Sequence, residues 1–175
     1  GYWEDIGTVG SFWECNLTLT DPVPPFDFFD GSNPVYTHAR YLPTAKLNGC
    51  KANRVLMADG AIVDDSEITR CVIGVRSVVR GGSRLENVVM MGADAFERPH
   101  DLAKNHALGR PDIGVGPNCV IRNAIIDKNA RIGAGCRLSP IGLPEKWESE
   151  SLFVRDGVIV VKKGAVVPPG TVVGE

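Results

Sequence analysis

The sequence predicts a mainly β fold, a parallel β-helix of hexapeptide repeats, preceded by a short helix and an extended linker. Aliphatic residues recur in steps of six from about Leu56 to the end of the chain. Small and turn-forming residues stand between them, and the chain contains 20 Gly and 12 Pro. Neither a helical period nor a strand period explains a step of six, whereas a short strand followed by a tight turn does.

Four series of aliphatic residues mark the repeat. The series are Ile62 and Ile68; Ile73, Val79, Leu85 and Met91; Val120, Ile126, Ile132 and Leu138; and Val161, Val167 and Val173. Three hexads make one triangular coil of about 18 residues, and one coil cannot bury its apolar side chains alone. We therefore expect the marked side chains to point into a prism and to stack on their equivalents in neighbouring coils.

The first 45 residues do not follow the repeat. Thr8 can cap a helix, and apolar residues at Phe12, Trp13 and Leu17 favour a short helix that ends by about Thr20. The sequence Asp-Pro-Val-Pro-Pro at 21–25 stops the helix, because proline cannot continue it. Residues 22–45 have no clear period and are expected to form an extended linker over a surface.

Two polar stretches interrupt the hexads. Residues 95–112 contain His100 and His106 and could form a loop with one or two helical turns. Residues 140–155 form a second insertion, which carries Trp147. Insertions in a stacked repeat often carry function or contacts, but a solvated loop remains an equally good interpretation.

Composition excludes several classes of protein. The net charge of −2 implies no broad basic surface for nucleic acid or an anionic membrane, and no apolar run approaches the ~20 residues of a membrane span. The five cysteines are scattered without a CxxC pair, so free thiols in the core are expected rather than disulfides or a zinc site. The chain starts with GYWED rather than Met, which is typical of a segment from within a longer protein.

Several segments resemble the ADP-glucose pyrophosphorylases in the same order along the chain. They are GYWEDIGT at 1–8, RYLP at 40–43, MMGAD at 90–94, IGVG at 113–116, IRNAIIDKNARIG at 121–133 and DGVIVVKK at 156–163. The IIDKNARIG run is specific, whereas hexads alone occur in many transferases. In detail the chain is more similar to the plant and cyanobacterial members than to the enteric bacterial ones.

The resemblance implies a left-handed β-helix at the C-terminal end of a glucose-1-phosphate adenylyltransferase. In that family, an N-terminal domain with a Gly-Gly-x-Gly-x-Arg-Leu signature joins ATP and glucose 1-phosphate into ADP-glucose and pyrophosphate. That signature is absent here, so we expect the 175 residues to be inactive alone. The implied organisation is the tail of the catalytic domain at 1–21, a linker at 22–45, and a regulatory and oligomerisation domain at 46–175.

Asp5 and Trp3 are the residues that the resemblance assigns to the catalytic site. Asp5 would be one carboxylate ligand of Mg²⁺, which bridges phosphate oxygens during nucleotidyl transfer, and its partner would lie in the catalytic domain. Trp3 would pack beside the glucosyl group. Without the resemblance, Asp5 would be interpreted as a helix-entry residue and Trp3 as a core residue.

A second group of residues is implied to bind an anionic effector such as 3-phosphoglycerate or phosphate. Lys128 and Lys163 would supply the ammonium groups, although the adjacent Lys162 leaves the choice of Lys163 open. The flanking candidates are His38 and Arg40, which would line a neighbouring anion site, and Asp94 and Asp127, which would orient the basic groups. For all of them, a solvated surface is the competing interpretation.

The implied partners are ATP, glucose 1-phosphate, the effector and other subunits of a homo- or hetero-tetramer, in a bacterial cytoplasm or a plastid stroma. Three other functions stay open. The chain could belong to another sugar-nucleotide pyrophosphorylase, such as a mannose-1-phosphate guanylyltransferase, or it could be a non-enzymatic oligomerisation module. A hexapeptide acyltransferase that uses acyl-CoA is less favoured, because no histidine falls inside a hexad block.

Overall fold

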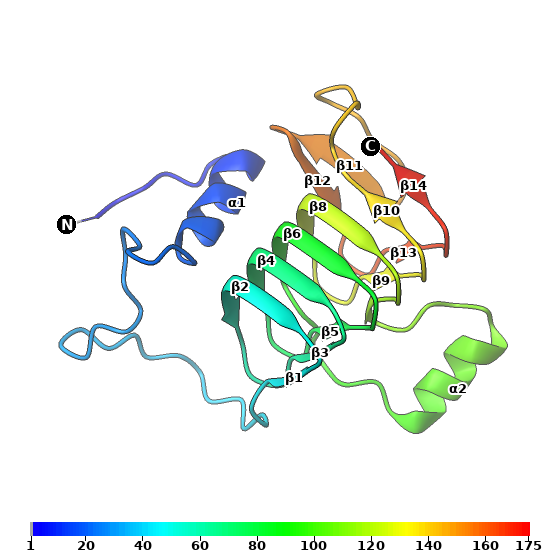
Figure 1. Ribbon diagram of the computed structural model, residues 1–175, viewed down its shortest axis with the longest axis horizontal. Coiled ribbons are helices and arrows are strands. Elements are labelled where there is room, and N and C mark those ends of the chain that lie inside the picture. Colours follow the sequence, from blue (N-terminus) through cyan, green and yellow to red (C-terminus); the bar gives the residue numbers. More distant parts are fainter. Residues whose placement is uncertain (1) are drawn as a thin grey trace.

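Fourteen short strands and two helices form the part of the chain that the computed structural model describes, residues 2–175 (Figure 1). Gly1, the first residue of the predicted catalytic-domain tail, lies outside this range. The elements are α1 (Val9–Thr18), β1 (Lys46–Asn48), β2 (Lys51–Met57), β3 (Ile62–Asp64), β4 (Glu67–Ile73), β5 (Val78–Val79), β6 (Arg84–Met90), α2 (Pro99–Ala107), β7 (Gly114–Val115), β8 (Val120–Ile126), β9 (Arg131–Ile132), β10 (Arg137–Leu138), β11 (Leu152–Arg155), β12 (Val158–Val161), β13 (Val166–Val167) and β14 (Val172–Val173). In the described range, neither helix has the length and apolar character needed to cross a membrane.

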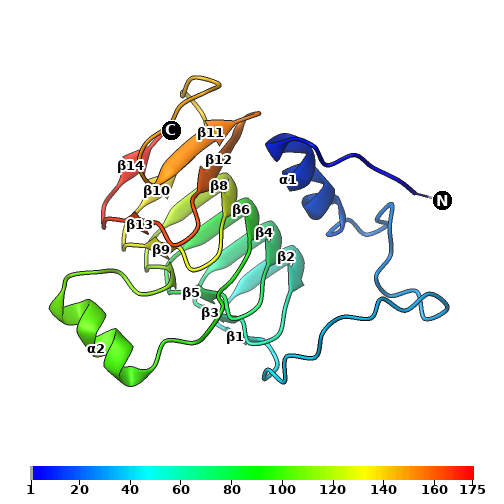
Figure 2. The ribbon, with the colours of Figure 1, turned by 180° about the vertical axis from the view of Figure 1, so that it is seen from behind.

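The strands wind into coils that stack as a triangular prism (Figures 1 and 2). Face 1 consists of β1, β3, β5, β7, β9 and β13, paired in parallel in that order. The long strands β2, β4, β6 and β8 bend in the middle, so their first halves form face 2 and their second halves form face 3. Strand β10 continues face 2, and β12 continues face 3. The predicted mainly β, parallel fold is confirmed.

One residue in left-handed backbone conformation makes the bend in each long strand. These residues are Arg54, Arg70, Asn87 and Asn123, with φ of 56°, 52°, 54° and 47°. Asparagine adopts this conformation more readily than most residues, because its short side chain can hydrogen-bond locally. Asn87 donates through Nδ2 to Asn123 Oδ1 at 2.9 Å, which links two successive bends along the corner.

One inward ladder, Val55, Cys71, Val88, Ala124 and Ile159, follows the bends, and each face sends a further ladder of side chains into the prism. The ladders are Leu47, Val63, Val79, Val115, Ile132 and Val167 on face 1; Ala52, Ile68, Leu85, Ile121, Leu138 and Val173 on face 2; and Met57, Ile73, Met90, Ile126 and Val161 on face 3. Side chains in the middle of the stack are buried, whereas Leu47 in the first coil is 49% exposed. Burial of each interior aliphatic side chain contributes about 1.5–3 kcal/mol.

The predicted inward positions are wrong by one residue at three places. The structure buries Val63, Met90 and Ile121 in the ladders in place of the predicted Ile62, Met91 and Val120. At Met91 and Val120 the reason is the single-residue bend, across which the inward step is five residues, as from Leu85 to Met90. At Ile62 the reason is the turn after β3, across which the step from Val63 to Ile68 is also five residues. A coil therefore takes 16 residues from Ala52 to Ile68 and 17 from Ile68 to Leu85, instead of about 18. The other marked residues belong to the ladders, as predicted.

The predicted N-terminal helix is confirmed as α1, and it packs on face 3 (Figure 1). Thr8 caps it, because its Oγ1 accepts a hydrogen bond from Ser11 N at 3.1 Å. The buried Leu17 packs with outward-facing valines and one isoleucine, Ile125, of face 3. Trp13 Nε1 donates to Asn87 O at 3.0 Å, and Glu14 pairs with Arg70. The helix is thus fixed to the corner formed by the bends.

Residues 22–45 contain no helix or strand, and most of their side chains are exposed. The segment runs from the end of α1 to the first coil, where Pro43 O accepts a hydrogen bond from Gly60 N at 2.7 Å. Strand β1 then begins at Lys46.

The first insertion leaves the prism between β6 and β7 and contains α2, in agreement with the predicted helical turns. It is anchored on face 1 by an ion pair of 2.8 Å between Glu97 and Arg131, whose side chains are only 10% and 14% exposed. Glu97 also accepts hydrogen bonds from Ile113 N at 2.8 Å and from Asn105 Nδ2 at 2.7 Å. The insertion is therefore an ordered part of the fold.

The second insertion leads into β11, which pairs with β12 in antiparallel orientation, unlike the pairs within the coils. Trp147 packs against the end of the core. Asp156 and Gly157 join the two strands, and both have positive φ, 53° and 72°. A two-residue Asp-Gly turn of this kind matches the twist of a tight hairpin.

Candidate functional site

Four of the six candidate effector residues, Asp94, Asp127, Lys128 and Lys163, meet at one corner between faces 3 and 1. Strand β8 ends at Ile126 and β12 ends at Val161, and each is followed by a tight turn that carries lysine. The turns stack directly, because Gly164 N donates to Lys128 O at 2.9 Å. Lys128 and Lys163 therefore lie on the same edge of the prism in neighbouring coils. We call this site, formed by Asp94, Asp127, Lys128, Asn129 and Lys163, the lysine corner.

Asp94 is the electrostatic partner of the lysine corner. Lys128 Nζ lies 3.1 Å from Asp94 Oδ1, and Asn129 Nδ2 donates to Asp94 Oδ2 at 2.8 Å. Hydrogen bonds from Asn129 and Lys128, together with the positive charges of Lys128 and Lys163, lower the pKa of Asp94 below its ordinary value. Asp94 is thus an anion that holds Lys128 in place at neutral pH.

The two adjacent lysines, between which the sequence did not decide, have different surroundings in the structure. Lys162 turns toward the second insertion, where its Nζ lies 3.0 Å from Glu148 Oε1 and donates to Ser149 O at 2.9 Å. Lys163 is exposed, and within residues 2–175 no carboxylate forms an ion pair with it. Of the two, Lys163 has the ammonium group available to an external anion.

Asp127 lies where the lysine corner meets the start of α1. Its Oδ1 accepts a hydrogen bond from Lys128 N at 2.6 Å, which shapes the turn. It also lines a hollow of about 400 Å³ together with Gly7, Thr8 and Met91. The remaining lining residues are Val9, Phe12, Ile125, Phe153 and Val160. The hollow separates the lysine corner from the segment that carries Asp5.

His38 and Arg40 are not brought to Lys128 by this chain. Both are exposed residues of the extended segment, which reaches the prism at Gly60 in the first coil. Gly60 and Asn129 occupy the same edge three coils apart, and stacked parallel strands are about 4.8 Å apart. About 14 Å of stacked coils therefore lies between the two places.

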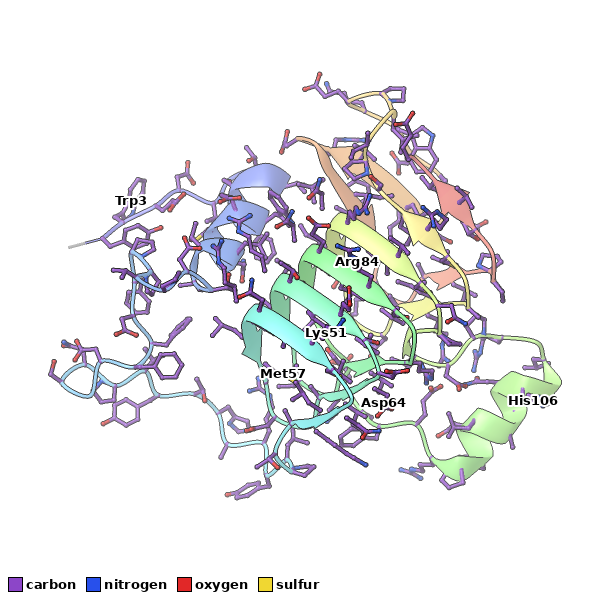
Figure 3. All side chains as sticks on the ribbon, in the orientation of Figure 1. Trp3, Lys51, Met57, Asp64, Arg84 and His106 are labelled. Carbon is purple, nitrogen blue, oxygen red and sulfur yellow. The ribbon has the colours of Figure 1, made fainter. Side chains whose placement is uncertain are left out.

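Trp3 and Asp5 lie in an exposed, extended segment ahead of α1. Trp3 is 83% exposed and projects away from the prism (Figure 3). Among residues 2–175, no group of three or more His, Cys, Asp or Glu residues could hold a metal ion. Asp5 offers one carboxylate, a hard oxygen ligand of the kind that Mg²⁺ prefers, so the remaining ligands would have to come from outside these residues.

The histidines lie outside the coils. His38 is in the extended segment, and His100 and His106 are on α2. Figure 3 shows His106 on the opposite side of the molecule from Trp3. No histidine thus approaches the lysine corner or the Asp5 segment within the described part of the chain.

Sequence reasoning missed Asn129 as a member of this site, and it missed Gly92, whose carbonyl oxygen accepts a hydrogen bond from Asn129 N at 3.0 Å. Asn129 has φ of 61°, and its side chain bonds Asp94 twice, since Asp94 N also donates to Asn129 Oδ1 at 2.9 Å. Gly92 has φ of 88°, and a Cβ there would lie 2.1 Å from Val75 O. An asparagine after the lysine of a hexad turn is the signal that could have pointed to the first of them.

Comparison with protein-family models agrees with this architecture. The model that describes the GLGC left-handed parallel β-helix domain matches residues 40–172, which is most of the chain and includes every coil. The match gives the prism its left-handed sense, and it covers Lys128, Lys163 and both insertions. Because the matched range spans well over half of the sequence, the chain belongs to the GLGC left-handed β-helix family, the C-terminal part of ADP-glucose pyrophosphorylase.

Proposed function

We propose that this chain is the regulatory and assembly portion of a glucose-1-phosphate adenylyltransferase, and that the lysine corner binds its anionic effector. The full-length enzyme would convert ATP and glucose 1-phosphate to ADP-glucose and pyrophosphate, for glycogen or starch synthesis. The effector class is a small phosphorylated acid such as 3-phosphoglycerate, or phosphate itself. The observation that carries the proposal is the stacking of Lys128 on Lys163 in neighbouring coils.

The chemistry of the lysine corner supports an anion rather than a cation or an apolar ligand. Lysine is a point charge that suits phosphate oxygens, and two ammonium groups on one edge act together on a single anion. Asp94 neutralises only part of this charge, because it pairs with Lys128 and leaves Lys163 without a carboxylate partner in the described residues. Because Lys163 is exposed, an effector can reach it from solvent.

The proposal for the catalytic site concerns the N-terminal segment. Asp5 would hold Mg²⁺ together with a carboxylate of the catalytic domain, and Trp3 would pack beside the glucosyl group. The metal would neutralise phosphate charge during nucleotidyl transfer. What supports this proposal is that both side chains are exposed in an extended segment, where a preceding domain can contact them. We also propose assembly into a tetramer, in a bacterial cytoplasm or a plastid stroma.

The test uses the full-length enzyme and its response to 3-phosphoglycerate and phosphate. Lys128→Ala and Lys163→Ala each remove one charge-assisted contact, which is worth about 1.5–3 kcal/mol, or roughly a 10- to 100-fold rise in the effector concentration at half-saturation. Lys51→Ala is the matched control, because Lys51 is also paired with one carboxylate, Glu67 at 2.9 Å, but lies on face 2 (Figure 3).

The control variant is expected to keep the half-saturation concentration of the wild-type enzyme. Unchanged half-saturation in both the Lys128 and the Lys163 variants would remove the effector assignment. An equal rise in the Lys51 variant would show that charge anywhere on the prism matters, and would overturn the assignment as well.

A further inference from the structure

The first turn of α1 is held from the side by a residue that is 146 positions away. Gly10 N donates to Asp156 Oδ2 at 3.0 Å. The amide N–H groups at the start of a helix have no partners within the helix, and a carboxylate there also interacts favourably with the helix dipole. Thr8 satisfies Ser11 N, whereas Asp156 satisfies Gly10 N. Asp156 therefore completes the cap of α1 from another element.

The close fit around Gly10 shows that this contact is specific. A Cβ at Gly10 would lie 2.9 Å from Asp156 Cβ and 3.6 Å from its carbonyl oxygen. Contacts below 3.0 Å require something to shift, so the sequence needs glycine here for the hairpin to reach the helix. Gly10 does not need glycine for its backbone conformation, because its φ is not positive.

Strand pairing and buried residues anchor the element that carries Asp156 to the prism. Asp156 occupies the Asp-Gly turn between β11 and β12, and β12 pairs in parallel with β8. Val158 and Ile159 are buried directly after the turn. Val9 and Phe12 near the start of α1 pack against the apolar cluster of face 3, whereas the polar contacts of Trp13 and Glu14 lie further along the helix.

We propose that Asp156 is a positioning residue for the catalytic-site segment. It fixes the entry of α1 against the hairpin, and so fixes the direction in which the preceding residues, including Asp5, leave the helix. Asp5 lies only a few residues before Thr8, the N-cap of α1. The hollow of about 400 Å³ beside Gly7 leaves the residues between Asp5 and Thr8 without close packing on the side that faces the hollow. This inference rests on the proposed role of Asp5.

The experiment measures kcat and KM of the full-length enzyme without effector. Asp156→Ala is expected to lower kcat about tenfold, with KM for ATP and glucose 1-phosphate changed less than threefold. Asp156→Asn is expected to stay within threefold of wild type, because the amide oxygen can accept the same hydrogen bond. Glu14→Gln, which breaks the ion pair with Arg70 in the middle of α1, is the control and is expected to keep kcat.

Gly10→Ala separates positioning from a role in helix stability alone. Alanine is the better helix former, so a purely structural role predicts an unchanged or more stable helix. Positioning instead predicts a loss of kcat similar to that of Asp156→Ala, because the new Cβ displaces the hairpin. The double variant Gly10→Ala with Asp156→Ala should then be no worse than either single one.

Two outcomes would overturn the proposal: full kcat in Asp156→Ala, or an equal loss of kcat in Glu14→Gln. The Asp5→Asn variant distinguishes failure of the positioning role of Asp156 from failure of the proposed catalytic role of Asp5. If Asp5→Asn abolishes activity while Asp156→Ala does not lower it, only the positioning role is refuted. If Asp5→Asn retains activity, the catalytic role of Asp5 is refuted, and the positioning role that rests on it falls too.

Discussion

Replacement of Leu85 by alanine tests whether the stacked ladders hold the prism together. Leu85 is fully buried on face 2 and lies in register between Ile68 and Ile121. The lost transfer free energy of three carbons is about 2.4 kcal/mol at about 0.8 kcal/mol for each. The cavity left between two rigid neighbours brings the expected loss to about 3–4 kcal/mol.

The matched control is Leu47→Ala, the same chemical change at the open end of the prism. Leu47 is 49% exposed and has a ladder neighbour, Val63, on one side only. We expect a loss of about 1 kcal/mol, since half of the side chain is already in water and no closed cavity forms. Thermal unfolding followed by circular dichroism should show a fall in Tm of about 6–16 °C for Leu85→Ala and about 2–4 °C for Leu47→Ala. Equal shifts for the two variants, or a loss below about 1.5 kcal/mol for Leu85→Ala, would refute this account of the core.

Three further predictions concern turns, charge and thiols. In urea unfolding, Gly133→Ala should lower the free energy of unfolding by more than 2 kcal/mol, because the new Cβ would lie 2.4 Å from Pro169 N. Gly135 has open space around it and a φ of 71°, so Gly135→Ala should lower the free energy of unfolding by only about 1 kcal/mol. Burial opposes ionisation of Glu97, but hydrogen bonds from Ile113 N, Asn105 and Arg131 outweigh this effect and lower the pKa of its carboxyl group. The Glu97 carboxylate therefore stabilises the fold above about pH 4.3, and this stabilisation is lost as the pH falls through the lowered pKa. Tm measured from pH 6 to pH 3 should therefore fall less steeply in Glu97→Gln, and a parallel fall in both proteins would contradict the assignment. Burial raises the pKa of Cys71 to about 12, so iodoacetamide at pH 8 should label Cys71 only after the protein unfolds. The half-buried Cys15 and Cys50 should be labelled in the native protein, and peptide mass mapping would detect both results.

The sequence was most informative where one local rule decides the structure. The step of six gave the parallel coils, and Thr8 with the apolar positions behind it gave the start of α1. The inward register failed at Met91 and Val120 because the bends at Asn87 and Asn123 shorten the step by one residue, and it failed at Ile62 because the turn at Asp65 does the same. Left-handed conformation at an arginine has no clear signature in a single sequence.

The candidate site also contains features that the sequence could predict and features that it could not. Lys128 and Lys163 were grouped through the family resemblance, and the structure stacks the two turns that carry them. The roles of Lys162 and Asp156 could not be predicted, because they depend on how the second insertion and the hairpin after it fold back, which brings Glu148 to Lys162 and Asp156 to Gly10. The same limit applies to Glu97 and Arg131, which come together only when the first insertion folds back on face 1.

The shortened bend also limits how such a protein can be altered. Adding one residue beside Asn87 would shift every side chain after it to the opposite side of its strand until the next turn, and would place Val89 inside and Met90 in solvent. Whole coils of 16 or 17 residues, cut at equivalent corners, are therefore the smallest units that can be removed or duplicated without exposing the interior. A chimera assembled from uniform repeats of about 18 residues would lose the inward register of its side chains within one coil.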